Sequence, residues 1–304
     1  MIRPVRFESN PQTAGSNRFQ GSTNATPEEQ HAAAILEFDV LVDALREKGV
    51  TVFVFEDTVD PHTPDAVFPN NWVSFHAGGE VVLYPMEALN RRSERRIDII
   101  DDLSGDLGFQ VSRVVDLTAH EQDGHYLEGT GSMVLDRVNR IAYACLSSRT
   151  QLDPLGDFAQ RMEYDVVAFD AVDCNGVPIY HTNVMMNVGE ELAVICAEAI
   201  PRVEQREAVL QRLQETGHEV VLLSYDQLNA FAGNMLELRC ADGGRLVAMS
   251  RKAFDSLDGA QREMLGRNGE VVAVPIDTIE ASAGGSVRCM LAEIHLPTIQ
   301  KSEE

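Results

Sequence analysis

The cysteine at position 289 lies in a sequence context that suits a reactive thiol. It follows the turn Gly284-Gly285-Ser286 and precedes an apolar run, residues 290–296, that is typical of extended structure. Glycines permit positive φ angles and close backbone approach, so this turn can present a thiol to a cavity. A cysteine nucleophile needs such a polarised, partly open position because the thiolate is the reactive form. The competing interpretation is a buried cysteine that packs as a small hydrophobe.

The other four cysteines are weaker candidates. Cys145 and Cys196 lie in apolar strand patterns and are expected in the core, whereas Cys174 and Cys240 adjoin turns and have no evident partner. The chain has five cysteines, no CxxC pair and no Cys/His cluster at metal-binding spacing. We therefore predict neither a disulfide framework nor a metal site, and Cys289 is the candidate nucleophile by elimination.

Three polar loops could supply the partners of this thiol. They cover residues 65–72, 125–132 and 180–184, and each adjoins a different predicted hairpin. If the hairpins stand in a ring, equivalent loops converge on its axis and residues far apart in sequence can meet. Glu128, His181 and Cys289 would then form an orienting carboxylate, a base and a nucleophile. The alternatives are a histidine that caps a turn and a carboxylate that is simply solvated.

The elements that must position these loops follow a repeating order. Hairpin, helix and strand recur four times, and the two chain ends could supply a fifth unit. The predicted hairpins cover 72–84, 132–144, 184–195 and 235–249, the helices 88–107, 153–163, 203–216 and 250–266, and the strands 110–116, 165–169, 219–223 and 270–274. Such a repeat indicates radial stacking rather than a doubly wound sheet. No linker interrupts the pattern, so a single domain over residues 1–304 is expected.

Composition and charge exclude several classes of partner. The formal net charge of −23 argues against nucleic acid and against anionic membranes. Hydrophobic residues make up 44% of the chain, which is typical of a globular protein, and the apolar runs are far shorter than the ~20 residues of a membrane helix. The N-terminal residues contain no signal-peptide core, so we expect a cytoplasmic location. A homo-oligomer remains open.

Four motifs together resemble those of a known superfamily. They are Phe68-x-Asn-Asn71, Leu127-Glu-Gly-Thr-Gly131, His181-x-Asn183 and the Gly-Gly-Ser-x-x-Cys that ends at Cys289. In order and spacing they are similar to the guanidino-group-modifying enzymes of the pentein superfamily, which include arginine deiminases, dimethylarginine dimethylaminohydrolases, amidinotransferases and succinylarginine dihydrolases. The resemblance is closest to bacterial citrulline-utilisation hydrolases, which share the Arg-Pro-Val-Arg-Phe start and the Phe-Pro-Asn-Asn-Trp motif.

The resemblance implies a fold and a set of roles. The fold is a five-bladed α/β-propeller of ββαβ units, with Cys289 as nucleophile, His181 as general acid/base and Glu128 as its partner or as an acceptor for a substrate nitrogen. Arg149 resembles the arginine that holds the substrate α-carboxylate in the dimethylarginine hydrolases, a task that a bidentate guanidinium suits. The alternative for Arg149 is a solvated loop cation. No metal or organic cofactor is implied, because the thiol supplies the covalent step.

Two departures from the superfamily pattern concern the substrate. Asn71 stands where arginine deiminases carry Asp, and Asn183 stands where they and the amidinotransferases carry Asp. A guanidinium has donors only, whereas a neutral ureido group has a carbonyl acceptor that an amide can serve. Asn17, in the N-terminal loop, and Asp65, in the loop 65–72, complete the predicted substrate-binding set.

These features predict a hydrolase of C–N bonds that acts on a small-molecule substrate. Citrulline is favoured, with ornithine, ammonia and CO2 as products. The alternatives are an arginine dihydrolase, an arginine or dimethylarginine deiminase and, less favoured, an amidinotransferase. A non-catalytic pentein that serves as a binding scaffold is a hypothesis from another class, and it conflicts with the retained Cys, His and Glu.

Overall fold

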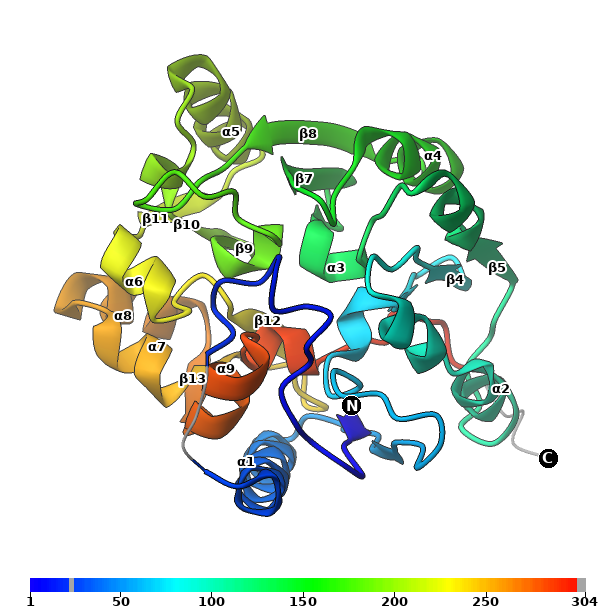
Figure 1. The fold of residues 1–304 in the computed structure, drawn as a ribbon. Coiled ribbons are helices and arrows are strands. Elements are labelled where there is room, and N and C mark those ends of the chain that lie inside the picture. The colour runs from blue at the N-terminus through cyan, green and yellow to red at the C-terminus, as the bar shows by residue number, and fades with distance from the viewer. Residues whose placement is uncertain (22–24, 300–304) are drawn as a thin grey trace.

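The computed structural model describes residues 1–21 and 25–299, so residues 22–24 and 300–304 of the predicted domain lie outside the described part. Four three-stranded sheets and one two-stranded sheet are arranged around a common centre, with most of the long helices at the periphery (Figure 1). The three-stranded sheets consist of β3 (Val73–Phe75), β4 (Glu80–Leu83) and β5 (Arg113–Asp116); β6 (Val134–Asp136), β7 (Ile141–Leu146) and β8 (Asp165–Asp170); β9 (Met186–Val188), β10 (Leu192–Ile195) and β11 (Glu219–Leu222); and β12 (Leu236–Arg239), β13 (Arg245–Ser250) and β14 (Glu270–Val274).

Each of these four sheets is built in the same way. The first two strands form an antiparallel hairpin, and the third returns parallel to the second after a helical segment. The crossover helices are α2 (Ile97–Gly105), α4 (Leu152–Met162), α5 (Val203–Glu215) and the pair α7 (Arg251–Ser256) and α8 (Gly259–Asn268). Parallel strands need such a crossover connection, and β-branched residues favour the strands. The predicted ββαβ unit is confirmed in all four repeats.

The fifth sheet differs from the prediction in its composition. It pairs β1 (Ile2–Arg3) with β2 (Phe55–Glu56) in parallel, with α1 (Pro27–Glu47) between them. Both strands therefore come from the N-terminal part of the chain. The apolar run 290–296 does not form a strand. Among the residues that the structure describes, it has no strand partner that would fix its position through a ladder of backbone hydrogen bonds. Its side chains are held instead by packing and by ion pairs.

Two helices predicted as continuous are divided. The segment 88–107 forms the 3-10 helix η2 (Leu89–Glu94) and then α2, because Arg95 and Arg96 are extended. The segment 250–266 divides at Leu257, which is also extended, and Asp258 begins α8 with a capping box to Gln261. The first division turns Arg91 into the interior, where it bears on the site described below.

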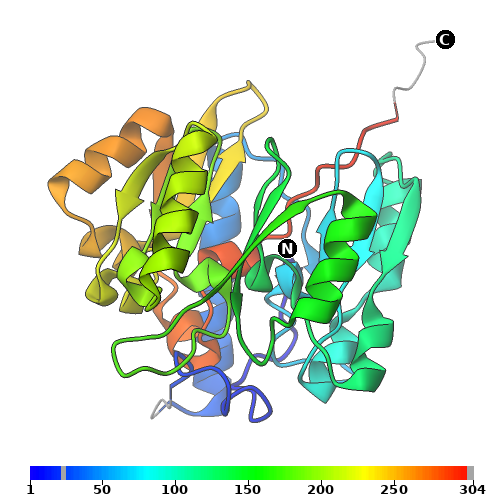
Figure 2. The ribbon, with the colours of Figure 1, turned by 90° about the horizontal axis from the view of Figure 1, so that it is seen from above.

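The polar loops predicted to converge do form short helical turns near the centre of the ring. These turns are η1 (Pro69–Asn71), α3 (Gly129–Ser132), η4 (Thr182–Val184) and η6 (Val287–Met290). The remaining elements are η3 (Thr118–Asp123), η5 (Ala197–Ala199), α6 (Tyr225–Asn229) and α9 (Asp277–Ala283). Seen from above, the N-terminal loop lies at the opposite end of the molecule from the turn that joins β12 and β13 (Figure 2).

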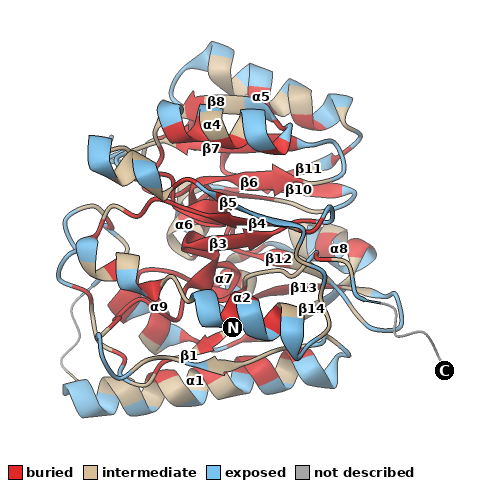
Figure 3. Cartoon of the chain, turned by 90° about the vertical axis from the view of Figure 1, so that its right-hand side faces the viewer, coloured by how far each residue is buried: buried red, intermediate tan, exposed pale blue. Residues whose placement is uncertain are grey.

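Burial follows this architecture. The sheets are largely buried, and the outer helices alternate buried and exposed positions (Figure 3). In α1, for example, Phe38, Leu41 and Leu45 are fully buried, which is the pattern expected when one stripe of a helix packs on a core. Of the helices in the described residues, none combines the length and the apolar character needed to cross a membrane.

Candidate active site

The four short turns bring the predicted site residues to one place. α3 packs against η1 and η4, and η1 packs against η6, although these turns belong to different parts of the sequence. Cys289 and His181 line the same small cavity at this point. Asn71, Asp65, Arg149 and Asn17 also line it. Glu128 and Asn183 lie directly behind the lining, where they contact His181 and Cys289 respectively.

The backbone around Cys289 matches its expected role as a presented thiol. Gly284 ends α9 with a φ angle of +65°, a conformation that a side chain would strain. The turn continues into η6, and Cys289 is buried with an exposed fraction of 2%. Its Sγ accepts hydrogen bonds from Nδ2 of Asn183, at 3.4 Å, and from Nδ2 of Asn234, at 3.3 Å.

His181 and Glu128 form a buried acid–base pair. Nε2 of His181 lies 2.9 Å from Oε2 of Glu128. Burial lowers the pKa of His181 to about 4, against the opposing effect of Glu128. Burial alone would raise the pKa of Glu128, but Arg149, His181 and Arg91 outweigh it and hold that pKa well below its usual range. A carboxylate can only accept, so the proton of the neutral imidazole lies on Nε2, and Nδ1 is free to take a proton.

Arg91 is a buried cation that sequence reasoning missed. Its guanidinium donates to both carboxylate oxygens of Glu94 and, from Nη1 at 3.0 Å, to Oδ1 of Asn71. It also lies 3.6 Å from Asp65 and 3.7 Å from Glu128. Because Arg91 engages the oxygen of Asn71, the amide orientation is fixed, and Nδ2 of Asn71 has no hydrogen-bond partner in the described part of the chain.

Asp65 has the complementary property. Its Oδ2 accepts from Nδ2 of Asn10 at 2.7 Å, whereas its buried Oδ1 is without a partner among residues 1–21 and 25–299. Unpaired buried polar atoms are rare in folded proteins and call for an explanation. Asn71 and Asp65 both line the cavity, and each has one buried polar atom, a donor and an acceptor respectively, without a partner in the described residues.

Arg149 and Asn17 hold the N-terminal loop over the cavity. Arg149 donates to the carbonyl of Thr13 and to Oγ of Ser16, contacts Glu128 and lies over the ring of Tyr180. The side chain of Asn17 donates to the carbonyls of Ala283 and Gly284 and accepts from the backbone of Phe19. In this state both side chains have protein partners.

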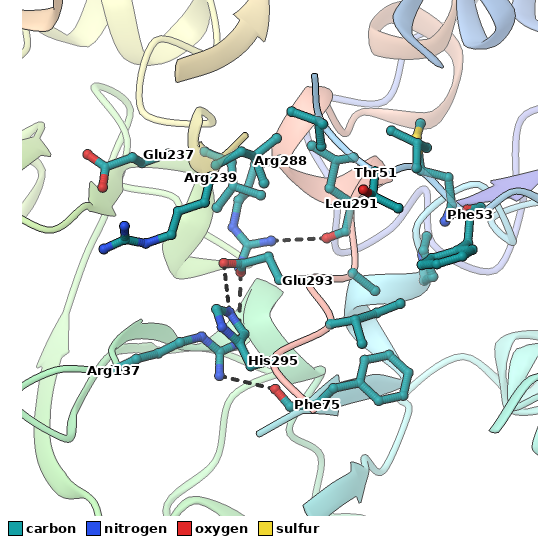
Figure 4. Close-up of a pocket in the computed structure, with 18 of the residues that line it drawn as sticks. Thr51, Phe53, Phe75, Arg137, Glu237, Arg239, Arg288, Leu291, Glu293 and His295 are labelled. Carbon is teal, nitrogen blue, oxygen red and sulfur yellow. Dashed lines mark hydrogen bonds and ion pairs between the residues drawn. The ribbon is translucent and has the colours of Figure 1, made fainter. Parts of the chain in front are cut away.

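The cavity is small. Its volume is about 10 Å³, which is room for roughly one water molecule. A much larger hollow of about 750 Å³ lies elsewhere, between the hairpin turns, and is lined by Arg137, Arg288, Glu293 and His295 among others (Figure 4). The charged side chains of the larger hollow pair with one another, whereas Asp65 and Asn71 at the small cavity each have a polar atom without a partner in the described residues. Arg288 faces the large one, and its neighbour Cys289 faces the small one.

The remaining cysteines differ from Cys289 in their surroundings. Cys145 and Cys196 are fully buried, and burial raises the pKa of each thiol to about 12. Cys174 is exposed, and Cys240 is half-buried against α1 and β12. Neither of these lines the small cavity.

Comparison with solved structures shows which class of fold this is. The apo structure of ArgZ, an arginine dihydrolase from the ornithine-ammonia cycle in cyanobacteria, matches with a TM-score of 0.73 and 18% identity over 99% of this chain and 41% of that one. The chain thus spans about two fifths of the length of ArgZ. The N-terminal domain of ArgZ bound to product matches with a TM-score of 0.72, 19% identity and 98% of both chains covered.

A dimethylarginine dimethylaminohydrolase adduct with S-methyl-L-thiocitrulline matches with a TM-score of 0.62 and 15% identity over 95% of this chain and 96% of that one. The fold is therefore that of the pentein superfamily, whose members modify guanidino groups.

The sequence places the chain more narrowly. Residues 3–296 match the model of the family described as "N,N dimethylarginine dimethylhydrolase, eukaryotic", and the chain belongs to this family. No curated protein matches the chain in sequence.

Proposed function

We propose that this protein hydrolyses the terminal C–N bonds of a guanidino amino acid and of its ureido counterpart, as an arginine dihydrolase does. Among the structures that it resembles are ArgZ and AgrE, solved with substrate, product, L-arginine or ornithine. The observation that carries the proposal is the pairing of a free acceptor on Asp65 with a free donor on Asn71 in one cavity.

The two atoms match the two stages of such a reaction. A guanidinium brings donors only, which Oδ1 of Asp65 can accept. After the first hydrolysis the terminal group is a ureido group with a carbonyl oxygen, to which Nδ2 of Asn71 can donate. Arg91 holds Asn71 in the orientation that the second stage requires.

The chemistry proceeds through the thiol. Neutral His181 takes the thiol proton at Nδ1, and the Cys289 thiolate attacks the central carbon. The imidazolium, stabilised by Glu128, donates this proton to the departing nitrogen, which leaves as ammonia while the S–C bond remains. His181 then activates a water, which adds to the same carbon and displaces the thiol. The second round leaves the carbamate of the ornithine side-chain nitrogen, and this carbamate decarboxylates by loss of its N–C bond and protonation of the nitrogen. Arginine plus two waters thus gives ornithine, CO2 and two ammonia.

The second candidate is that citrulline, rather than arginine, is the initial substrate, and one observation favours it. Arg91 is a fixed buried cation within hydrogen-bonding distance of Asn71. A second guanidinium beside it would be repelled, whereas a neutral ureido group would not. We propose that Arg149 exchanges its contacts with Thr13 and Ser16 for the substrate α-carboxylate, with Asn17 beside it.

Product analysis tests both candidates. Arginine, citrulline, dimethylarginine and agmatine are incubated with the protein and with Cys289→Ser, and ammonia and ornithine are quantified. We expect ornithine from arginine and citrulline, two ammonia per ornithine from arginine, and no turnover by the serine variant. Citrulline accumulating as the end product from arginine would show a deiminase, and equal release by Cys289→Ser would contradict the proposed nucleophile.

A further inference from the structure

Asn234 lies against the sulfur of Cys289 although the motifs did not reveal it. It follows Phe231, which has a φ angle of +62°, in the turn that precedes β12, and it is fully buried. Its Nδ2 donates to the backbone carbonyl of Asn183 at 2.9 Å and to Sγ of Cys289 at 3.3 Å. A carbonyl can only accept, so the first bond fixes the NH2 group of Asn234 on the side of the thiol.

Asn183 completes the arrangement from the neighbouring blade. Its Nδ2 donates to the same sulfur at 3.4 Å. Neither asparagine lines the small cavity, whereas Cys289 does, so both amides reach the sulfur from behind and leave its other side to a substrate. The sulfur is thus held by two neutral donors.

The nearby cations are engaged elsewhere. Arg91 pairs with Glu94, Arg149 contacts Glu87 and Glu128, and Arg288 pairs with Glu293 across the larger hollow. Among the described residues, the hydrogen bonds that Sγ accepts come from these two amides, and the neutral thiol can itself donate to Oδ1 of Asn234 at 3.7 Å.

We propose that Asn183 and Asn234 form a two-amide cradle that stabilises the Cys289 thiolate, and that Asn234 is a catalytic residue of this site. This inference rests on the proposed function and deepens it. A ureido substrate is neutral and brings no positive charge to the thiolate, so the protein itself must supply the donors. Hydrogen bonds to the charged form favour it, whereas a carboxylate at either position would repel the thiolate.

The test measures the thiol directly and does not depend on turnover. Wild type, Asn234→Ala, Asn234→Asp and Asn234→Ser are alkylated with iodoacetamide over a range of pH, and each cysteine is followed by peptide mass spectrometry. The exposed Cys174 is an internal reference in every sample. Asn268→Ala is the matched control, because Asn268 is a buried asparagine that bonds Met264 in α8.

For Asn234→Ala we expect the alkylation midpoint of Cys289 to rise by about one pH unit, which is about tenfold less thiolate at neutral pH. Asn234→Asp should shift it further, and Asn234→Ser, which keeps a donor, should shift it less. Cys174 and the Asn268→Ala profile should not move. Circular dichroism verifies that each variant is folded.

An unchanged Cys289 midpoint in folded Asn234→Ala and Asn234→Asp overturns the cradle. That outcome differs from a failure of the proposed function, in which the midpoint shifts as expected while wild type releases no ammonia from any tested substrate.

Discussion

Glu128 and His181 are both buried, and their surroundings place the charge on the carboxylate. Desolvation is the largest single influence on both groups, but at Glu128 it is outweighed by Arg149 and Arg91, which lie within 4 Å, together with His181. The pair therefore rests as a carboxylate and a neutral base. That is the state in which His181 can take the thiol proton, and Glu128 then stabilises the imidazolium that forms.

The lowered pKa of His181 makes stability depend on pH. Its folded-state pKa, about 4, lies below the ordinary value of 6.5, so the unfolded chain binds the proton first as the pH falls. The unfolding free energy should decrease between pH 6.5 and pH 4, by about 3 kcal/mol from this residue. Urea denaturation of wild type and His181→Asn across this range measures it. Parallel pH dependence in the two proteins would contradict the assignment.

The catalytic side chains could be proposed from sequence, but their supports could not. Cys289, His181 and Glu128 occur in short glycine-bearing motifs. Asn234 occupies a place before its hairpin that resembles those of Asn71 and Asn183, a signal that the repeat could have supplied. Arg91 lay within the helix predicted over residues 88–107, and the 3-10 turn η2 directs it inward.

At the scale of elements, the short turn α3 fixes two of the site residues by close approach. A Cβ on Gly131 would lie 2.4 Å from Nδ2 of Asn71 and 2.7 Å from Nδ1 of His181. Both side chains are anchored at their far ends, by Arg91 and by Glu128, so neither can yield easily. Position 131 therefore requires glycine, because any side chain there would clash with Asn71 and His181.

Gly131→Ala should therefore abolish most activity, with a loss on the order of 10²-fold or more in kcat, because it displaces the general base. Gly156→Ala is the matched control. Gly156 is exposed in α4 with open space around it, and alanine there should preserve activity and add up to about 1 kcal/mol of stability. Ammonia-release kinetics and thermal unfolding of both variants check this. Equal activity in the two variants would show that the site tolerates a methyl group at 131.

The positions of the helices and hairpins were easier to predict than the points at which two of the helices break. Apolar runs separated by turn residues located the hairpins, whose strands are largely buried. The divided helix at 250–266 was readable in principle, since Asp258 and Gln261 stand at capping-box spacing. The break at Arg95 and Arg96 has no comparable signal, because it depends on Arg95 reaching Glu121 in another segment.

At the scale of the whole molecule, the C-terminal run contributes Glu293 to a cluster of ion pairs that lines the larger hollow. Glu293 lies 3.2 Å from Arg288 and 3.8 Å from Arg137, and Figure 4 shows these side chains directed toward one another. Burial would raise the pKa of Glu293, but the two arginines hold it well below its usual range. This cluster joins η6 to the hairpin turn that follows β6.

Glu293→Gln should lower the unfolding free energy by about 3 kcal/mol, because two poorly solvated arginines lose their counter-charge. Glu219→Gln is the control, since the Glu219–Arg267 pair is exposed and should contribute less than about 1 kcal/mol. Urea denaturation of both variants compares them. Similar small losses would mean that the cluster contributes little to closing the ring.

The ring itself was predictable from the fourfold recurrence of hairpin, helix and strand. The fifth blade was not, because β1 and β2 are only two residues long and are separated in sequence by the long helix α1. Short strands carry too few residues for a period to be read.

Capture of the covalent intermediate tests the central claim most directly. Wild type, His181→Asn and Cys289→Ser are incubated with S-methyl-L-thiocitrulline, quenched in acid and mapped by peptide mass spectrometry. We predict an adduct on the peptide that contains Cys289, more persistent in His181→Asn because no base activates the hydrolytic water, and absent from Cys289→Ser. An adduct on another cysteine, or one that survives in Cys289→Ser, would contradict the account.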